Sequence, residues 1–215
     1  MSHAAAETKQ TMELVGCKVW NFNGDCYDFG KDNCDLKVVD CVAYANGNNA
    51  AFKIWGDRVQ LINCVSYRNG LAFVVSGKNV EMRHCLSAFD KVGLELGNNT
   101  REGAGDGMKV IGCIFHKASR AGMYLKGKGQ TASYEVLNCL FSACEPVGCI
   151  RLGAECLKAD AAFVAPEEND SRLTANSPAV DAASPVGAPP ADLLGNKRAD
   201  GKPDIGPYEY VGAKQ

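Results

Sequence analysis

A repeated pattern of apolar residues and cysteine constrains the fold of this chain more than any other feature. The form apolar-x-apolar-x-x-Cys occurs six times, with cysteines 21 to 28 residues apart: Cys17, Cys41, Cys64, Cys85, Cys113 and Cys139. A second motif, apolar-x-apolar followed by Gly, comes after each of them, in segments 27–30, 52–56, 73–77, 94–97, 123–127 and 150–153. Turn residues such as Asn46-Gly47 and Asn69-Gly70 separate the two motifs. Each repeat unit is therefore read as two short strands joined by turns.

One such unit cannot bury its own apolar face, whereas units stacked at the strand spacing of roughly 4.8 Å share a continuous core. A leucine-rich repeat has a similar length, but its leucine consensus is missing and no helical segment fits between the strands. The sequence thus predicts an all-β protein, a right-handed parallel β-helix (a solenoid) of about six coils over 12–156. The rest, 157–215, is expected to be an extended C-terminal tail that packs on the helix and caps it. Residues 1–11 are expected to be disordered or added for expression.

Composition and charge exclude several classes of protein. The formal net charge is −2, which argues against a nucleic-acid partner because such proteins usually carry a basic excess. No run of 18 apolar residues occurs, so no membrane span is expected. The first eleven residues lack the apolar segment of a signal peptide, so the sequence does not give the localisation directly.

Two segments resemble a known group of proteins. The run AFKIWGDRVQLINCVSYRNGLAFVVSG (51–77) resembles the repeats of pectate-lyase-like β-helix proteins, in particular the ninth polysaccharide lyase family. The tail phrases Ser-Pro-Ala-Val-Asp (177–181) and Asp-Ile-Gly-Pro-Tyr-Glu (204–209) resemble the closing segment of secreted bacterial β-helix proteins. The resemblance implies an extracellular or periplasmic protein with a polysaccharide as its partner. It is specific for the fold and only weakly specific for activity, because enzymes and non-enzymes share it.

The repeated cysteines are interpreted as a ladder in the core. Eleven cysteines are present, and six share one repeat position, so their side chains should stack inward as small apolar groups. Parallel stacking gives poor geometry for disulfides. A metal site is the alternative. It has little support, because the chain has only three histidines and two of them, His84 and His116, occupy unlike repeat positions.

The second motif provides the candidate substrate-binding face. Its middle residue should point to solvent, which predicts one outward column: Asp28, Lys53, Val74, Glu95, Tyr124 and Arg151. Trp55 and Lys126 lie two residues beyond column members, and the longest inter-cysteine insertion supplies Arg101. Such mixed acidic, basic and aromatic groups suit a sugar-binding groove, with Trp55, Glu95, Tyr124, Lys126 and Arg101 as the binding residues. The alternative is an ordinary solvated sheet face.

An acidic cluster in the first coil suggests a metal site. Related lyases hold calcium with aspartates and use a lysine as base, so the resemblance implies Asp25, Asp28 and Asp32 as calcium ligands. Lys53 and Arg151 are then the catalytic candidates, with Lys53 as the base beside a polarised uronate. The alternative is that Asp28 and Lys53 form an ordinary cross-strand ion pair.

A further apolar column, Val15, Val39, Ile62, Ile111 and Leu137, is interrupted by Arg83 and needs cover, which the tail is expected to provide. Three functions stay open. The first is a carbohydrate-active domain that binds or cleaves, by β-elimination, an acidic polysaccharide. The second is a non-catalytic binding or scaffold module, such as the C-terminal part of a larger surface protein. The third is self-association into a homo-oligomer through an uncapped N-terminal coil.

Overall fold

The computed structural model describes residues 11–30, 35–97, 99, 101–127, 132–148, 150–153 and 155–212. Among these residues, no helix is long and apolar enough to cross a membrane. The expected disorder of residues 1–11 concerns a segment that, apart from Thr11, lies outside the described ranges. The candidate calcium ligand Asp32 also lies outside them.

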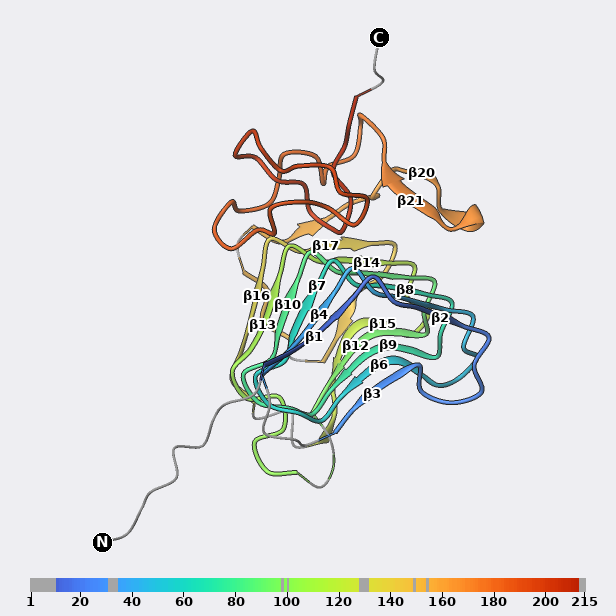
Figure 1. The fold of residues 1–215 in the computed structure, drawn as a ribbon, viewed down its shortest axis with the longest axis vertical. Helices are drawn as coiled ribbons and strands as arrows, with labels where there is room; N and C mark the ends of the chain where they lie inside the picture. The colour runs from blue at the N-terminus through green and yellow to red at the C-terminus, as the bar shows by residue number, and fades with distance from the viewer. Residues whose placement is uncertain are drawn as a thin grey trace, which may run out of the picture.

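The chain folds as a parallel β-solenoid of about five turns, which confirms the predicted fold class. Three parallel sheets form its walls (Figure 1). Sheet A contains β1 (Thr11–Val15), β4 (Asp35–Val39), β7 (Gln60–Ile62), β10 (Glu81–Arg83), β13 (Met108–Ile111) and β16 (Tyr134–Leu137). Sheet B contains β2 (Lys18–Trp20), β5 (Val42–Tyr44), β8 (Val65–Tyr67), β11 (Leu86–Ala88), β14 (Ile114–His116), β17 (Leu140–Ser142) and β19 (Leu157–Lys158). Sheet C contains β3 (Tyr27–Phe29), β6 (Ala50–Ile54), β9 (Leu71–Val75), β12 (Val92–Leu96), β15 (Ala121–Leu125) and β18 (Pro146–Val147).

Each coil therefore holds three strands, and the expectation of two was incomplete. The strand that was missed is the three-residue strand of sheet B, which begins directly after the repeated cysteine. The residue before that cysteine turns the chain from sheet A into sheet B with a positive φ, at Gly16, Asp40, Asn63, His84, Gly112 and Asn138. Glycine, asparagine and aspartate tolerate this left-handed conformation best, which explains why they dominate the position.

The interior is built from ladders of like residues. Cys41, Cys64, Cys85, Cys113 and Cys139 are buried and unbridged, as the core interpretation predicts. Their thiols donate to carbonyl oxygens of the preceding coil, for example Cys64 Sγ to Val38 O at 3.3 Å. Burial raises the pKa of the Cys41 thiol to about 12, so this thiol is neutral. Cys156 extends the ladder, because the residues that follow Cys139 and Cys156 pair in register.

The tail covers the outer face of sheet B. Figure 1 shows it (orange to red) lying over β17, β14 and β8, with the hairpin β20 (Phe163–Ala165) and β21 (Asp170–Leu173) at one side. A second core cluster fills this interface, combining Val65, Leu86 and Ile114 of the sheet with Ala179 and Ile205 of the tail. The tail was expected to cover the apolar column of sheet A, and it contacts that column where Arg83, which lies between Ile62 and Ile111, donates to Gly187 O at 3.4 Å.

The two tail phrases that resemble β-helix closing segments bind each other. Asp181 N donates to Asp204 Oδ1 at 2.7 Å, and Ile205 N donates to Ala179 O at 2.9 Å. Gly206 N then donates to Gly112 O of the solenoid at 2.8 Å. These hydrogen bonds fix the tail to the solenoid and so set the position of the tail residues over sheet B.

Three buried side chains complete this latch. Arg198 forms an ion pair with Glu209 and donates to Gly206 O at 2.7 Å. His84 Nδ1 lies 3.0 Å from Asp204 O, so this nitrogen carries the hydrogen and donates. Burial and the nearby Arg198 guanidinium lower the pKa of His84 to about 3, so the imidazole is neutral.

Candidate functional site

The predicted outward column exists on sheet C, with one error. Asp28, Lys53, Val74, Glu95 and Tyr124 follow one another in register across β3, β6, β9, β12 and β15. The next partner of Tyr124 is Val147 of β18, so the prediction that Arg151 ends this column is wrong. The last coil is short and its strand comes before the apolar-x-apolar motif of 150–153, which leaves Arg151 in irregular chain. There its backbone N–H donates to the Tyr134 hydroxyl at 3.0 Å.

Lys53 lies between two aspartates. Its Nζ is 2.7 Å from Asp25 Oδ2 and 3.2 Å from Asp28 Oδ2. The hydrogen bond to Asp25 is the main reason that the pKa of Lys53 is raised, and the same bond helps to lower the pKa of Asp25 against the effect of its burial. Lys53 is therefore a charged partner in this arrangement, whereas a proton-abstracting lysine needs a lowered pKa.

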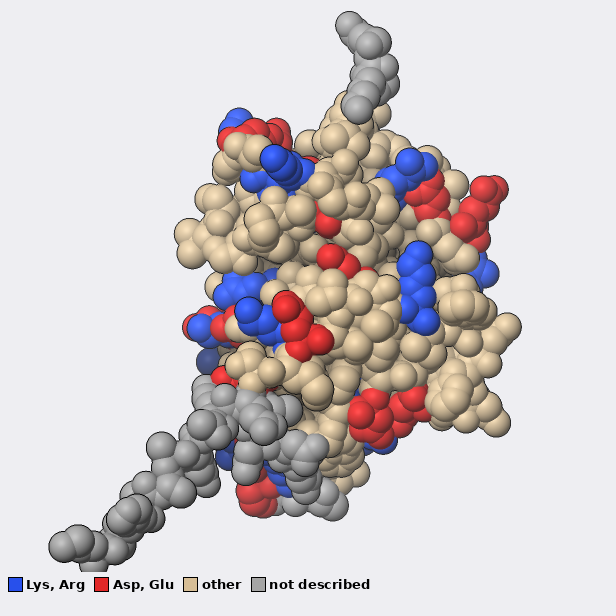
Figure 2. All heavy atoms as spheres, in the orientation of Figure 1, with Lys and Arg blue, Asp and Glu red and all other residues tan. Residues whose placement is uncertain are grey.

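The other charged groups on this face are also paired. Glu95 is only 5% exposed and accepts a bond from Lys126 Nζ at 2.8 Å. The guanidinium of Arg120 lies 5.0 Å from the centre of the Tyr124 ring. In Figure 2, several Lys and Arg side chains lie close to Asp and Glu side chains, while one stands alone amid uncharged surface.

Arg101 ties its loop to earlier coils. One nitrogen lies 2.6 Å from Asp57 Oδ1, and another donates to Ser76 O at 3.1 Å and to the carbonyl oxygen of Trp55. The ring of Trp55 is also within reach of Lys53, whose Nζ is 5.9 Å from the ring centre. The structure thus brings Asp25, Lys53 and Trp55 together in this corner of sheet C, while Arg101 holds backbone there.

The metal hypothesis rests on two described carboxylates. Asp25 and Asp28 share Lys53, and Asp25 also accepts the backbone N–H of Ala50 at 2.9 Å. No group of three or more His, Cys, Asp or Glu side chains that could hold a metal ion occurs within the part of the chain that the structure describes. Calcium takes six to eight oxygen ligands, so these two carboxylates do not by themselves make its site.

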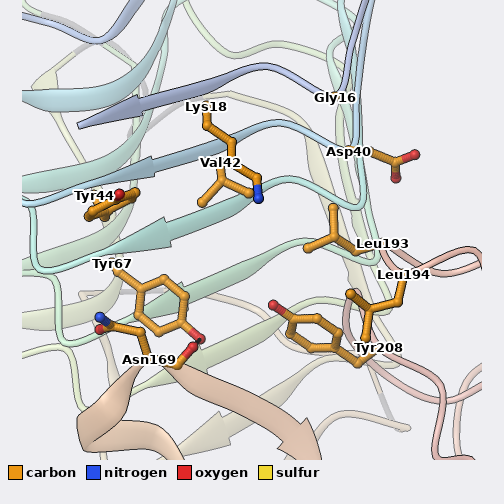
Figure 3. A pocket seen from close by; sticks show the side chains of 10 residues that line it. All are labelled: Gly16, Lys18, Asp40, Val42, Tyr44, Tyr67, Asn169, Leu193, Leu194 and Tyr208. Carbon is orange, nitrogen blue, oxygen red and sulfur yellow. Dashed lines mark hydrogen bonds between the residues drawn. The ribbon is translucent and has the colours of Figure 1, made fainter.

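A hollow lies on a different face, between the first strands of sheet B and the tail. It has a volume of about 620 Å³, and we call it the groove. Figure 3 shows its lining: Gly16, Lys18, Asp40, Val42, Tyr44 and Tyr67 from the solenoid, and Asn169, Leu193, Leu194 and Tyr208 from the tail. Sequence reasoning did not find this site, because the tail's position on sheet B could not be read from the repeat.

Aromatic side chains form one wall of the groove. Tyr44 stacks on Trp20 of the preceding coil, with ring centres 5.7 Å apart and planes 4° from parallel. Trp20 is 54% exposed, which is unusual for so large an apolar group. The hydroxyl of Tyr67 donates to Asn169 O at 3.1 Å, and this bond holds the hairpin at the groove.

The sequence did contain a signal for this wall. Trp20, Tyr44 and Tyr67 each stand three residues after a ladder cysteine, and they pair in register on adjacent strands. Three-residue strands were not recognised there because only their middle residue points inward.

Lys18 is the cation of the groove. In contrast to Lys53, it has no ion pair with any described residue, and Figure 3 shows it extending over Val42. The nearby Asp40 accepts a bond from Asn63 Nδ2 at 3.0 Å, and its carboxylate points away from Lys18. A ligand anion in the groove would therefore meet a positive charge without competition from an existing salt bridge.

No protein-family model matches the chain, and a search of curated proteins found no match.

Proposed function

We propose that this protein is a carbohydrate-active β-helix domain that binds an acidic polysaccharide in the groove. The observation that carries the proposal is a hollow of about 620 Å³ whose lining includes Tyr44, stacked on the exposed Trp20, and Lys18, which has no ion pair with any described residue. The likeness of the repeats and of the tail phrases to secreted pectate-lyase-like proteins points to the same class of ligand.

The aromatic pair suits a sugar ring. A pyranose presents a face of C–H groups that packs on an aromatic face, and a Trp or Tyr side chain combines such a face with a polar group at its rim. The stacked Trp20 and Tyr44 rings are held by strands β2 and β5, so the platform exists before the ligand arrives. A preformed platform favours binding because few side chains lose freedom when the ligand docks.

The lysine selects an acidic sugar. The Lys18 ammonium stands on the same strand as Trp20 and two residues from it, so both side chains point to the same side of β2. A uronate carboxylate bonded to Lys18 would make a charge-assisted hydrogen bond, which is stronger than a bond between neutral groups.

Cleavage by β-elimination is the second candidate, and it belongs to sheet C. The placement of Lys53 between Asp25 and Asp28 favours cleavage. A metal cation bound by both aspartates would compete with Lys53 for them and so release the lysine from its ion pairs. In the ion-paired state Lys53 cannot accept a proton at neutral pH, so we propose binding rather than cleavage as the principal function.

Calorimetric titration with polygalacturonate, alginate and glycosaminoglycan fragments tests the binding proposal. We expect at least one of them to bind, and Tyr44→Ala and Lys18→Ala each to weaken its affinity by roughly tenfold, equivalent to about 1.4 kcal/mol. Lys37→Ala is the matched control, because Lys37 is an exposed lysine on the outer side of sheet A. Absence of binding to every acidic polymer, or equal loss in the Lys37 variant, would refute the proposal.

The same samples test cleavage through the ultraviolet absorbance of the unsaturated product, with and without calcium. Product formation that requires calcium and disappears in Lys53→Ala would make the protein a lyase. Binding without product would establish a binding module.

A further inference from the structure

A second hollow lies beside the groove, at the corner where the chain passes from sheet B to sheet C. It has a volume of about 390 Å³, and we call it the corner hollow. Its lining includes Asn21, Phe22, Asn23, Asn48 and Asn49. The repeat marked Asn23 and Asn46 of this corner only as turn residues.

The two hollows are neighbours. Asn21, which lines the corner hollow, directly follows Trp20 of the aromatic pair. Ala45 lines the corner hollow and directly follows Tyr44, which lines the groove. A chain molecule that leaves the groove across the Trp20–Tyr44 platform therefore arrives in the corner hollow.

The corner hollow differs from the groove in charge. None of the described residues that line it is charged, whereas the groove contains Lys18 and Asp40. A carboxylate that entered the corner hollow would lose water without gaining a cation, which is unfavourable. An uncharged unit suffers no such penalty.

The polar groups of the corner hollow match hydroxyl groups. The side chains of Asn21, Asn23, Asn48 and Asn49 make no hydrogen bond with any described residue. An asparagine amide donates and accepts at once, as does each hydroxyl of a sugar, so the two kinds of group are complementary. Phe22 is 53% exposed and adds an apolar face against which a ring can pack.

We infer that the ligand is a polysaccharide in which an acidic sugar alternates with an uncharged one, the acidic unit lying at Lys18 in the groove and the uncharged unit in the corner hollow. This inference rests on the proposed function and narrows it, because polymers in which every unit is a uronate would place a carboxylate in the corner hollow. Glycosaminoglycans such as hyaluronan have the alternating pattern, whereas polygalacturonate and alginate do not.

The test compares two oligosaccharides of equal length, a hyaluronan hexasaccharide and a galacturonate hexasaccharide, by calorimetric titration. We expect the alternating oligosaccharide to bind roughly tenfold more tightly. The double substitution Phe22→Ala with Asn48→Ala should abolish that preference and leave the affinity for the galacturonate oligomer unchanged. Asn48 is chosen over Asn21 because Asn21 has a φ of 52°, so alanine there would strain the backbone.

Controls separate the possible failures. Asn176→Ala removes an exposed asparagine of the tail that lines neither hollow and should change neither affinity. Asn48→Ala alone gives the same comparison, with a smaller effect, if the double variant melts at a lower temperature than the parent protein. Equal or tighter binding of the galacturonate oligomer, or a preference that survives both variants, would overturn the inference while leaving the proposed function intact. If neither oligosaccharide binds, the inference fails, and the proposed function fails with it when no acidic polymer binds either.

Discussion

The outer face of sheet C and the groove on sheet B carry similar residues in different states. On sheet C the cation Lys53 is held by Asp25 and Asp28, and Lys126 is held by Glu95. In the groove, Lys18 has no described ion-pair partner and the exposed Trp20 stacks on Tyr44. On a face whose charged side chains are already paired with one another, few charges are available to bind a ligand. Residue types alone therefore do not identify a site. The partners of each residue decide.

The largest expected effect comes from breaking the latch that holds the tail. Because the tail lines the groove, this change should disrupt the groove and leave the outer face of sheet C intact. Arg198 is buried and paired with Glu209, so Arg198→Met leaves a buried carboxylate without its cation. We expect a loss of about 3–5 kcal/mol in the free energy of unfolding, measured with urea. The groove should lose its ligand, because the tail supplies Tyr208 and Asn169.

The exposed pair of Arg172 and Asp170 provides the control for this experiment. Arg172→Met also removes an arginine from a tail ion pair, but one that solvent screens, and stability and binding should be unchanged. A latch variant as stable as the Arg172 variant would show that the tail is not held in this way.

A smaller effect concerns the corner that joins the two regions. Asp90 is fully buried and accepts bonds from Ser66 Oγ at 2.9 Å, Asn69 N at 2.8 Å and Ser87 Oγ at 2.7 Å. Burial raises its pKa from 3.8 to about 7, despite these bonds. The folded state therefore holds the proton more tightly than the unfolded state, and the stability contributed by the protonated carboxyl is lost as the pH rises from about 4 to about 7.

Asp90→Asn should remove this loss, giving at most about 4 kcal/mol more stability at neutral pH than the parent protein and no gain below pH ~4. The preceding coil shows that asparagine fits: Asn69 Oδ1 accepts from Asn46 N at 2.9 Å, while its Nδ2 donates to Ser66 Oγ at 2.8 Å. Unfolding free energies of both proteins across this pH range check the prediction. Parallel pH curves for the two would contradict it.

The smallest effect is expected on sheet C. Lys53→Met removes a pair that is about a quarter exposed on each side, so the cost should be at most about 1 kcal/mol. Because the pKa of Asp25 is lowered in the folded state, the pair's contribution is present above the unfolded-state value of 3.8 and lost as the pH falls below it. Saccharide affinity should be unchanged. A large loss of affinity in this variant would move the binding site to sheet C.

The repeat predicted the fold because equivalent core positions of a solenoid recur in the sequence at the spacing of its coils. Cys41, Cys64 and Cys85 share one environment, so their spacing marks the coils and sets the register of the sheet C column from Asp28 to Tyr124. The error at Arg151 arose where the repeat ends, because the last coil is shorter and β18 pairs earlier than the motif indicated.

The groove could not be predicted from the repeat, because it depends on where non-repeating chain lies. Tyr208 reaches Tyr44 and Lys18 only after the tail has docked on sheet B, and that docking depends on single interactions such as Gly206 N with Gly112 O. The ion pairs of Lys53 were foreseen as one of two readings, and only the distances show that both aspartates engage it.

The chain's two tryptophans allow the most direct test of the account, because Trp20 stands beside the groove and Trp55 on sheet C. Trp55→Phe leaves Trp20 as the only tryptophan, and Trp20→Phe leaves Trp55. The intrinsic fluorescence of each variant would be followed while the acidic oligosaccharide that binds the parent protein is added. We predict a saturable change in the variant that retains Trp20 and a constant signal in the variant that retains Trp55. The opposite pattern would contradict binding in the groove and place the ligand on sheet C.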